Sequence, residues 1–301
     1  MLLSDNKQLF LDIIREISIT NNILPIFIEK DFFAISVLKE LVSQNDKLVF
    51  KGGTSLSVCY NAINRFSEDV DLSYVDEKIT VGIRKAIKQT FVKSIGALSL
   101  TLNNLDEIRS RRSFNRYICS YGSLFSKDGG RIILEWSTIT PSFPIEEQTA
   151  QTIIGKYLEQ SGRHDLVKQY NLERFVVKTL SIERTIIDKI FAICDYHLSG
   201  FVDRESRHLY DIHKLLTEVS LDDNFLFLFK KIFEYRKPLS GCRSAKDGQL
   251  ISLLLYDLVK RETFKTDYIQ KTFVLLYDQT KYDDCISSIL KIADYLKDNN
   301  L

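Results

Sequence analysis

Several features are scarce or missing in this sequence of 301 residues, and each absence argues against a class of protein. No apolar stretch approaches the 18 or more residues that a membrane span requires. The five cysteines are scattered, odd in number and without a C-x-x-C pair, so we expect neither a disulfide framework nor a zinc site, and a reducing cytoplasmic location. The opening residues, MLLSDNKQLF, carry an acid and a lysine where a secretion signal is apolar, so we expect no targeting signal.

Two common nucleotide-binding motifs are also missing. The P-loop pattern G-x-x-x-x-G-K-[ST] does not occur, and no G-x-G-x-x-G follows a predicted strand. A P-loop kinase and a Rossmann dehydrogenase are therefore disfavoured. The net charge is only +1, so the overall charge gives no sign of a nucleic-acid-binding protein, and any RNA contact must come from a local patch. What remains is the composition of a globular protein, 45% hydrophobic and 27% charged.

The most informative stretch runs from Lys47 to Tyr74. Its first part is a short apolar run that ends at Gly52 and Gly53, where the backbone can bend or approach a ligand closely. Thr54 and Ser55 come next and can cap a helix whose first N–H groups point back at the turn. A double glycine by itself most often marks only a turn, so the function of this one depends on the residues after the helix.

A pair of acids lies after that helix. Asp69 and Asp71 lie two residues apart, which on a strand puts both carboxylates on one face. Such a pair can be no more than a solvated strand end. It can also bind a cation that offsets the repulsion, and Mg²⁺ is the natural candidate because it takes oxygen ligands and leaves room for phosphates. A glycine turn that opens a helix, together with alternating acids on the next strand, is typical of the nucleotidyltransferase superfamily.

A third acid stands out in the predicted strand 131–137. Alternation places Glu135 on the face opposite Ile132, Leu134 and Trp136. An acid in an apolar strand is costly unless it is paired or bound to metal, so we expect Glu135 either to complete the metal site or to form a buried salt bridge.

Hydrophobic periodicity predicts an α+β chain, with a small mixed sheet flanked by helices in residues 1–150 and a mainly helical lobe in 151–301. Besides the two strands of the central stretch, we expect strands at 98–102, 114–121 and 131–137, and short ones around 152–154 and 175–180. The expected helices cover 5–20, 25–44, 80–92, 182–198, 206–219, 223–236, 246–261, 266–276 and 283–297. Because composition changes after Pro141 and Pro144, the boundary is placed near 145–155.

Charged residues stand out at two places in the helical half. Lys189 lies at the edge of an apolar stripe, where a lysine either snorkels to solvent or reaches into a cleft to neutralise phosphate charge. Arg207 and Asp211 are spaced i,i+4, which on a helix surface gives a simple ion pair.

Four segments occur in an order that resembles the AbiEii/AbiGii toxin family of nucleotidyltransferases. They are K-G-G-T-S-L at 51–56, R-F-S-E-D-V-D-L at 65–72, E-R-T-I-I-D-K at 183–189 and R-H-L-Y-D-I at 207–212. This family supplies the toxins of two-gene toxin–antitoxin and phage-defence systems, and it includes the mycobacterial MenT toxins that modify tRNA. The resemblance implies a nucleotidyltransferase-fold lobe at 1–150 and a helical lobe at 151–301 that completes the active-site cleft.

The resemblance also implies roles for individual residues. It assigns metal binding to Asp69 and Asp71, with Glu135 added from the sheet pattern, and catalysis to these three with Lys189 and Asp211. The residues expected to bind the nucleotide are Lys51, Gly52, Gly53, Thr54, Ser55, Ser67, Arg184 and Lys189. Glu135 or Asp211 is the expected acceptor of the hydroxyl proton.

The implied reaction transfers a nucleoside monophosphate from an NTP to an acceptor hydroxyl and needs Mg²⁺, with Mn²⁺ as a substitute. The leading acceptor is the 3′ end of tRNA, with a cognate antitoxin as protein partner. Arg109, Arg111 and Arg112 form a basic turn that is either solvated or in contact with RNA. Two alternatives remain open: a nucleotidyltransferase acting on protein or small-molecule hydroxyls, and a non-catalytic module that binds nucleotide or a partner.

Overall fold

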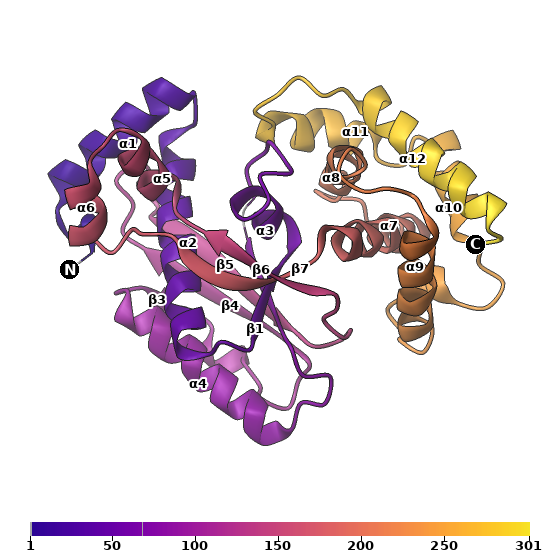
Figure 1. The fold of residues 1–301 in the computed structure, drawn as a ribbon, viewed down its shortest axis with the longest axis horizontal. Coiled ribbons are helices and arrows are strands. Elements are labelled where there is room, and N and C mark those ends of the chain that lie inside the picture. Colours follow the sequence, from indigo (N-terminus) through magenta and orange to yellow (C-terminus); the bar gives the residue numbers. More distant parts are fainter. Residues whose placement is uncertain (1, 68) are drawn as a thin grey trace. The chain divides into compact units, whose positions relative to one another are not determined.

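The computed structural model describes residues 2–67 and 69–301, and contacts divide the chain into two units (Figure 1). The first unit contains the residues up to Tyr60 and Ser67–Leu180, and the second contains Asn61–Phe66 and Ser181–Leu301. A six-residue segment from the first half of the sequence therefore belongs to the helical unit. No helix in the described part of the chain is both long enough and apolar enough to cross a membrane.

The first unit is built on a mixed sheet with strand order β3-β4-β5-β2-β1-β7-β6. The strands are β1 Leu48–Lys51, β2 Asp69–Tyr74, β3 Thr101–Leu102, β4 Phe114–Tyr121, β5 Gly130–Ser137, β6 Ile145–Ala150 and β7 Phe175–Leu180. At its centre β2 pairs antiparallel with β1 and parallel with β5. The sheet continues past the predicted boundary near residue 150, because β6 and β7 are hydrogen-bonded to each other and β7 to β1.

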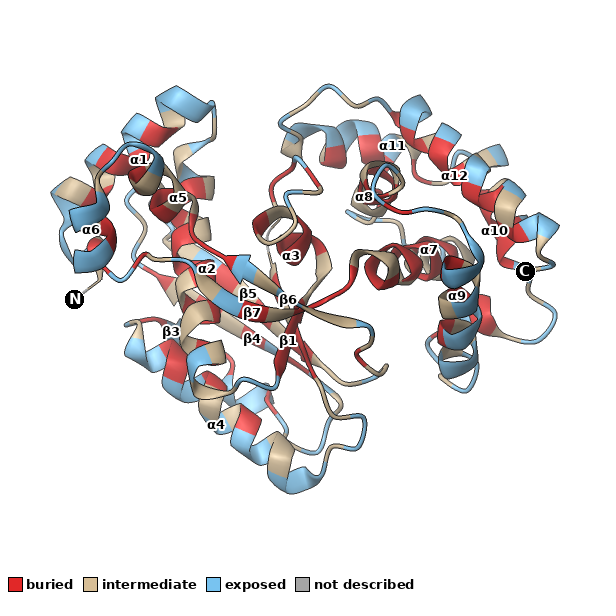
Figure 2. Ribbon diagram, viewed as in Figure 1, coloured by how far each residue is buried: buried red, intermediate tan, exposed pale blue. Residues whose placement is uncertain are grey.

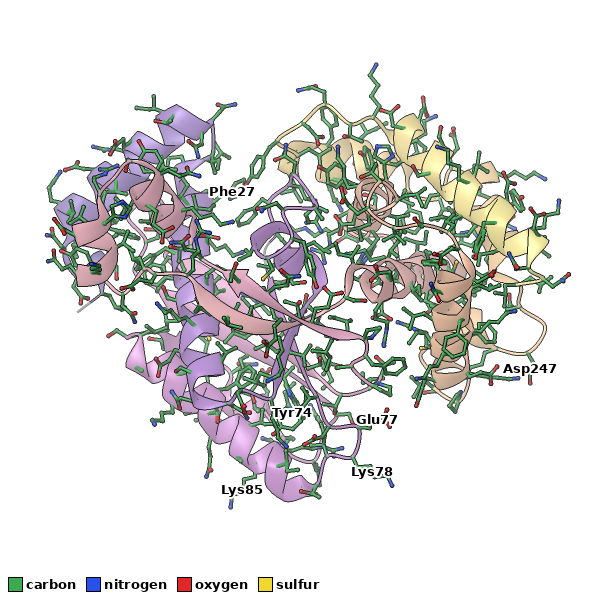
Figure 3. All side chains as sticks on the ribbon, viewed as in Figure 1. Phe27, Tyr74, Glu77, Lys78, Lys85 and Asp247 are labelled. Atoms are coloured by element: carbon green, nitrogen blue, oxygen red, sulfur yellow. The ribbon has the colours of Figure 1, made fainter. Side chains whose placement is uncertain are left out.

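Two helices of the first unit pack their aromatic side chains on one face of this sheet. The helices of this unit are α1 Lys7–Asn21, α2 Pro25–Gln44, α3 Gly52–Val58, α4 Val81–Ala97, α5 Ile153–Gln160 and α6 His164–Gln169. Phe33 of α2 stacks on Tyr121 of β4 at 4.0 Å between ring centroids, and Phe91 of α4 stacks on Tyr117 at 4.4 Å. Each such pair adds about 0.5–1.5 kcal/mol beyond the burial of its area. Figure 2 shows the buried faces of α2 and α4, and Lys85 projects from the outer side of α4 (Figure 3).

The second unit is helical and packs around α7. Its helices are α7 Ile182–Ser199, α8 Arg207–Leu215, α9 Asp223–Arg236, α10 Ile251–Lys260, α11 Lys265–Asp267 and α12 Tyr282–Asp298. The hydroxyl of Ser181 caps α7 by accepting from the N–H of Arg184 at 3.3 Å, and Gly200 ends the helix with φ of +71°. Phe191 of α7 stacks on Phe229 of α9 at 5.0 Å.

Some expected elements differ in the structure. The expected strand 98–102 is reduced to Thr101–Leu102, because α4 runs on to Ala97. Residues 152–154 begin α5 rather than a strand, since the Thr152 hydroxyl accepts from the N–H of Gly155 as a helix cap. β6 was missed, because IEEQTA has little strand propensity and is held at the sheet edge by its pairing with β7.

Candidate active site

The glycine turn and the second acid are in direct contact. β1 ends at Lys51, and Gly52 then adopts a left-handed backbone conformation with φ of +79°. A Cβ atom on Gly52 would lie 2.2 Å from Oδ2 of Asp71 and 3.0 Å from its Cγ, which is too close for non-bonded atoms. Glycine meets both conditions because it has no Cβ and adopts positive φ readily. The Asp71 carboxylate therefore packs directly against the backbone of the turn at Gly52.

Asp69 and Asp71 share one face of β2, as their spacing predicts. Val70 and Leu72 are fully buried on the opposite face, whereas both acids are half-buried. In the parallel pairing of β2 with β5, Asp71 lies opposite Glu135, so the three acids face the same side of the sheet. Strand neighbours are about 4.8 Å apart, which places two carboxylate side chains next to each other across the two strands.

Glu135 is paired with a cation in this structure. Arg116 of β4 lies opposite Glu135, and its Nε and Nη2 atoms are 2.7 and 2.6 Å from Oε1. The salt bridge expected as the alternative role of Glu135 is therefore present, although it is partly exposed rather than buried. Within residues 2–67 and 69–301, no three or more His, Cys, Asp or Glu side chains are gathered so as to hold a metal.

The oxygen donors on this face nevertheless suit a hard cation. Asp69 and Asp71 present half-buried carboxylates beside a turn that leaves the Asp71 carboxylate room, and Mg²⁺ prefers such ligands. Glu135 can join them if its carboxylate turns from Arg116 toward Asp71.

Thr54 connects the glycine turn to the acidic strand. Its buried hydroxyl lies 3.0 Å from Oγ of Ser67 and donates to the backbone carbonyl of Asp69. Ser55 is also buried, and its hydroxyl donates to the carbonyl of Gly52 at 2.9 Å. These hydroxyls hold the turn and the start of β2 in place, so the groups that the turn has to offer a phosphate are backbone N–H groups.

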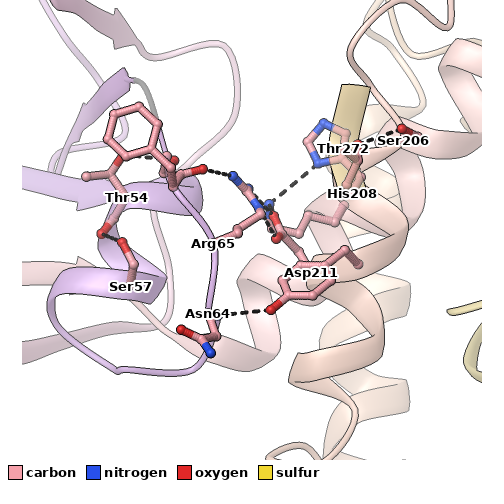
Figure 4. A network of polar contacts seen from close by, with 12 residues as sticks. Thr54, Ser57, Asn64, Arg65, Ser206, His208, Asp211 and Thr272 are labelled. Carbon is pink, nitrogen blue, oxygen red and sulfur yellow. Dashed lines mark hydrogen bonds and ion pairs between the residues drawn. The ribbon is translucent and has the colours of Figure 1, made fainter. Parts of the chain in front are cut away.

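In the second unit, Lys189 and Asp211 meet in the interior and are joined by Arg65 (Figure 4). Asp211 is fully buried, and Lys189 Nζ lies 2.6 Å from its Oδ2. Arg65 binds both oxygens of Asp211, with Nε 2.6 Å from Oδ1 and Nη2 2.7 Å from Oδ2. Asp211 therefore lies in a buried cluster rather than on the helix surface that its spacing from Arg207 suggested, because α8 turns Asp211 toward α7.

The charge states depend on burial and neighbours. Burial opposes ionisation of Asp211, but Arg65 and Lys189 outweigh this effect and hold its pKa below the usual range. Burial lowers the pKa of Lys189, an effect that Asp211 partly offsets. Burial and the Lys189 charge lower the pKa of His208 to about 4, so this histidine is neutral at pH 7. Two cations surround one carboxylate, and the cluster carries an excess of positive charge.

Backbone bonds fix the segment that carries Arg65. The N–H of Phe66 donates to the carbonyl of Leu275 at 3.0 Å, and the N–H of Tyr277 donates to the carbonyl of Asn64 at 2.9 Å. The N–H of Asn64 also donates to the hydroxyl of Tyr210 at 3.1 Å (Figure 4). Arg65 therefore approaches Asp211 from a fixed main chain.

Arg184 lies in the interior. Its side chain is 1% exposed, and its Nε lies 3.1 Å from Oδ1 of Asp188 on the same helix. Arg236 of α9 binds the same oxygen at 2.8 Å and covers the ring of Phe191. These contacts hold Arg184 and Arg236 against the same carboxylate of α7.

Sequence reasoning gave no role to two residues that hold site carboxylates, Arg65 and Arg116. Arg65 is the first residue of R-F-S-E-D-V-D-L, and its place in that motif was an available signal. Arg116 had no comparable signal, because its role depends on the register between β4 and β5.

Residues 36–287 match the family model described as nucleotidyl transferase AbiEii toxin, of type IV toxin–antitoxin systems. The chain belongs to the AbiEii family. The matched region includes the glycine turn, the three sheet acids and the cluster of Lys189 and Asp211. No curated protein sequence matches the chain significantly.

One solved structure shows the same fold for this AbiEii member, and two others are less similar. MenT4, a nucleotidyltransferase toxin from Mycobacterium tuberculosis H37Rv, has a TM-score of 0.53 at 16% identity, over 91% of this chain and 85% of that one. JHP933 from Helicobacter pylori has a TM-score of 0.47 at 18% identity, over 90% of this chain and 93% of that one. A structure described as a putative nucleotidyltransferase from H. pylori has a TM-score of 0.46 at 17% identity, over 90% of this chain and 96% of that one. The likeness to MenT4 confirms the predicted α+β nucleotidyltransferase fold.

Proposed function

We propose that this chain is a toxin that transfers a nucleoside monophosphate from an NTP to the 3′ end of tRNA, releasing pyrophosphate and blocking translation. Membership of the AbiEii family supports an NTP substrate and a cognate antitoxin as partner. The observation that carries the proposed chemistry is the face of β2, where Asp69 and Asp71 lie side by side and Asp71 rests on the Gly52 turn.

Asp69 and Asp71 would hold Mg²⁺, or Mn²⁺ in its place, with Glu135 as the third oxygen donor. When bound, the ion supplies positive charge to the NTP phosphates and their leaving group. The chain itself supplies the backbone N–H groups of residues 52–55 for the triphosphate and holds the start of β2 through Thr54.

Lys189 would offset the negative charge that develops on the phosphates. Asp211 positions Lys189, since its two oxygens already bind Arg65 and Lys189 at 2.6–2.7 Å. A carboxylate whose pKa is lowered by two cations is a weak proton acceptor, which disfavours Asp211 as the group that accepts the hydroxyl proton.

The arginine turn of the first unit is suited to an RNA backbone. Arg109, Arg111 and Arg112 are exposed, while buried Asn115 accepts from the N–H of Arg109 at 2.9 Å and donates to its carbonyl at 3.1 Å. A turn whose main chain is fixed in this way presents its guanidinium groups at a lower cost in entropy. Phosphate contacts of this kind position an acceptor without reading its sequence.

The test is a labelling assay. The purified protein is incubated with Mg²⁺ and each α-³²P-labelled NTP in turn, in the presence of total tRNA or of total protein. Asp71→Asn, which keeps the side-chain volume and removes the charge, is the matched control. Label on tRNA 3′ ends that disappears with Asp71→Asn is the expected result, and it also identifies the nucleotide.

Two outcomes would contradict the proposal. Label on protein alone would move the acceptor to a polypeptide hydroxyl. No label on either acceptor, together with measurable NTP binding, would leave a nucleotide-binding module in place of an RNA-modifying enzyme.

A further inference from the structure

Four charged residues form a row across the central strands of the first unit. Lys51 of β1 lies opposite Asp71 of β2, Asp71 opposite Glu135 of β5, and Glu135 opposite Arg116 of β4. Residues in register share one face of a sheet, so the charges along this row run positive, negative, negative, positive. The two central acids repel each other, and a cation stands on each outer side.

The pair between Arg116 and Glu135 is one that a competing cation can displace. Arg116 Nε and Nη2 both lie close to Oε1 of Glu135, at 2.7 and 2.6 Å. The Arg116 side chain is 53% exposed. Pairs of this kind contribute little to stability, because water and salt screen them.

The arginine–carboxylate pair of the second unit has the opposite character. Arg65 binds both oxygens of Asp211, and the side chains of this pair are 3% and 0% exposed. Breaking a buried pair leaves an uncompensated charge in the interior. Separating Arg65 from Asp211 therefore costs much more free energy than separating Arg116 from Glu135. Arg65 therefore stabilises the fold, whereas Arg116 can give up its carboxylate partner to another cation.

We propose that Arg116 is the internal counter-cation of Glu135, competes with the divalent metal for this carboxylate, and thereby sets the metal affinity of the site. The inference rests on the proposed function, which places the metal on Asp69 and Asp71. Without a bound ion, Arg116 is the cation that neutralises Glu135. On metal binding, Glu135 exchanges this partner for the ion beside Asp71, and Arg116 turns to solvent. Arg116 is thus a positioning residue.

The experiment measures Mn²⁺ binding to the full-length protein without nucleotide, by electron paramagnetic resonance or calorimetry. Arg116→Gln removes the competing charge and should tighten Mn²⁺ binding roughly 3- to 10-fold. Arg116→Lys keeps the charge and should stay within about twofold of wild type. Arg112→Gln, the same change at an exposed neighbouring arginine, is the matched control and should have an effect below about twofold.

Two further variants separate this inference from the proposed function. In a Glu135→Gln background, Arg116→Gln should have no further effect, because the carboxylate for which the two cations compete is gone. Asp71→Asn should abolish saturable Mn²⁺ binding.

Wild-type or weaker affinity in Arg116→Gln would overturn the inference, as would equal effects of Arg116→Gln and Arg112→Gln. If Asp71→Asn binds Mn²⁺ as wild type does, or if no variant shows saturable binding, the metal site of the proposed function fails as well. Thermal unfolding of each variant checks that the sheet remains folded.

Discussion

Arg65 and Asp211 form a buried ion pair in which the guanidinium binds both carboxylate oxygens, although one residue precedes the acidic strand and the other lies on α8. Asp211 also binds Lys189, so a change at any of the three leaves a charge without its partner in the interior. This arrangement gives the acid of the last family motif a structural role that does not require proton transfer.

The first prediction concerns this cluster. Arg65→Met and Asp211→Asn should each lower the free energy of unfolding of the helical unit by about 3–5 kcal/mol. The double variant should be less destabilised than the sum of the two, with a coupling of roughly 1–3 kcal/mol. Denaturant unfolding followed by circular dichroism measures this.

The control for this cycle is Arg261→Met, which removes an arginine that is 70% exposed and paired with Asp257 in the same unit. It should cost no more than about 1 kcal/mol. If Asp211→Asn keeps wild-type stability while losing all labelling activity, a direct chemical role for Asp211 would replace the positioning role.

The second prediction concerns the glycine turn. Gly52→Ala should reduce labelling activity at least as strongly as Asp71→Asn, because the new Cβ would displace the Asp71 carboxylate. It should also destabilise the first unit by about 1–2 kcal/mol, the cost of a left-handed conformation for alanine.

Gly96→Ala is the matched control for the turn. Gly96 lies on α4 with no heavy atom within 4 Å of a new Cβ, so alanine there should stabilise the protein by about 0.5–1 kcal/mol. An active Gly52→Ala enzyme would show that the contact with Asp71 is not required.

The third prediction concerns acid. The pKa of His208 is lowered to about 4 in the folded protein, against about 6.5 when unfolded, because the ring is buried beside Lys189. Its contribution to stability is complete above pH 6.5 and is lost as pH falls toward 4, by at most about 1.4 kcal/mol per pH unit.

His208→Gln should flatten this part of the stability profile. His164→Gln, at an exposed histidine that begins α6, should leave the wild-type slope unchanged. Denaturant titrations between pH 4 and 7 decide, and identical slopes for wild type and His208→Gln would contradict the assignment.

The fourth prediction concerns a carboxylate whose stabilising contribution is lost as pH rises rather than as pH falls. Burial raises the pKa of Asp31 on α2 to about 7, although its Oδ2 accepts from the N–H of Ile153 at 2.6 Å. Its stabilising contribution is complete below the unfolded value of about 3.9 and is lost as pH rises through 7. Asp31→Asn should therefore raise the free energy of unfolding at pH 8, by on the order of 1 kcal/mol.

Asp12→Asn, at an exposed carboxylate on α1, is the control and should be neutral at pH 8. The measurement is denaturant unfolding at pH 5 and pH 8. A destabilised Asp31→Asn at pH 8 would mean that the carboxylate is charged and needed by the start of α5.

Local patterns predicted local structure well. The expected spans 25–44, 114–121 and 223–236 coincide with α2, β4 and α9, because helical and strand periodicity depends on neighbours in the sequence. The shared face of Asp69 and Asp71 was predicted from strand geometry alone, and the outward orientation of Glu135 from alternation along β5.

Partners could not be predicted in the same way. Asp211 was paired with Arg207 by helical spacing, but tertiary packing buried Asp211 and brought Arg65 to it from another part of the chain. The ion pair of Glu135 depends on strand register, which no pattern within one strand specifies. The sequence therefore identified Asp211 and Glu135 as candidate site residues, but their arginine partners could be seen only in the folded structure.

The membership of Asn61–Phe66 in the helical unit has a consequence for the timing of synthesis. These residues complete their main-chain pairing only with Leu275–Tyr277, which emerge from the ribosome roughly 10–40 s later at about 5–20 residues per second. A nascent chain therefore carries the three sheet acids, and later Lys189, well before Leu275–Tyr277 are available to pair with the segment that carries Arg65. No single cut separates the two units either, so a fragment that ends at Leu180 lacks the partners of its own residues 61–66.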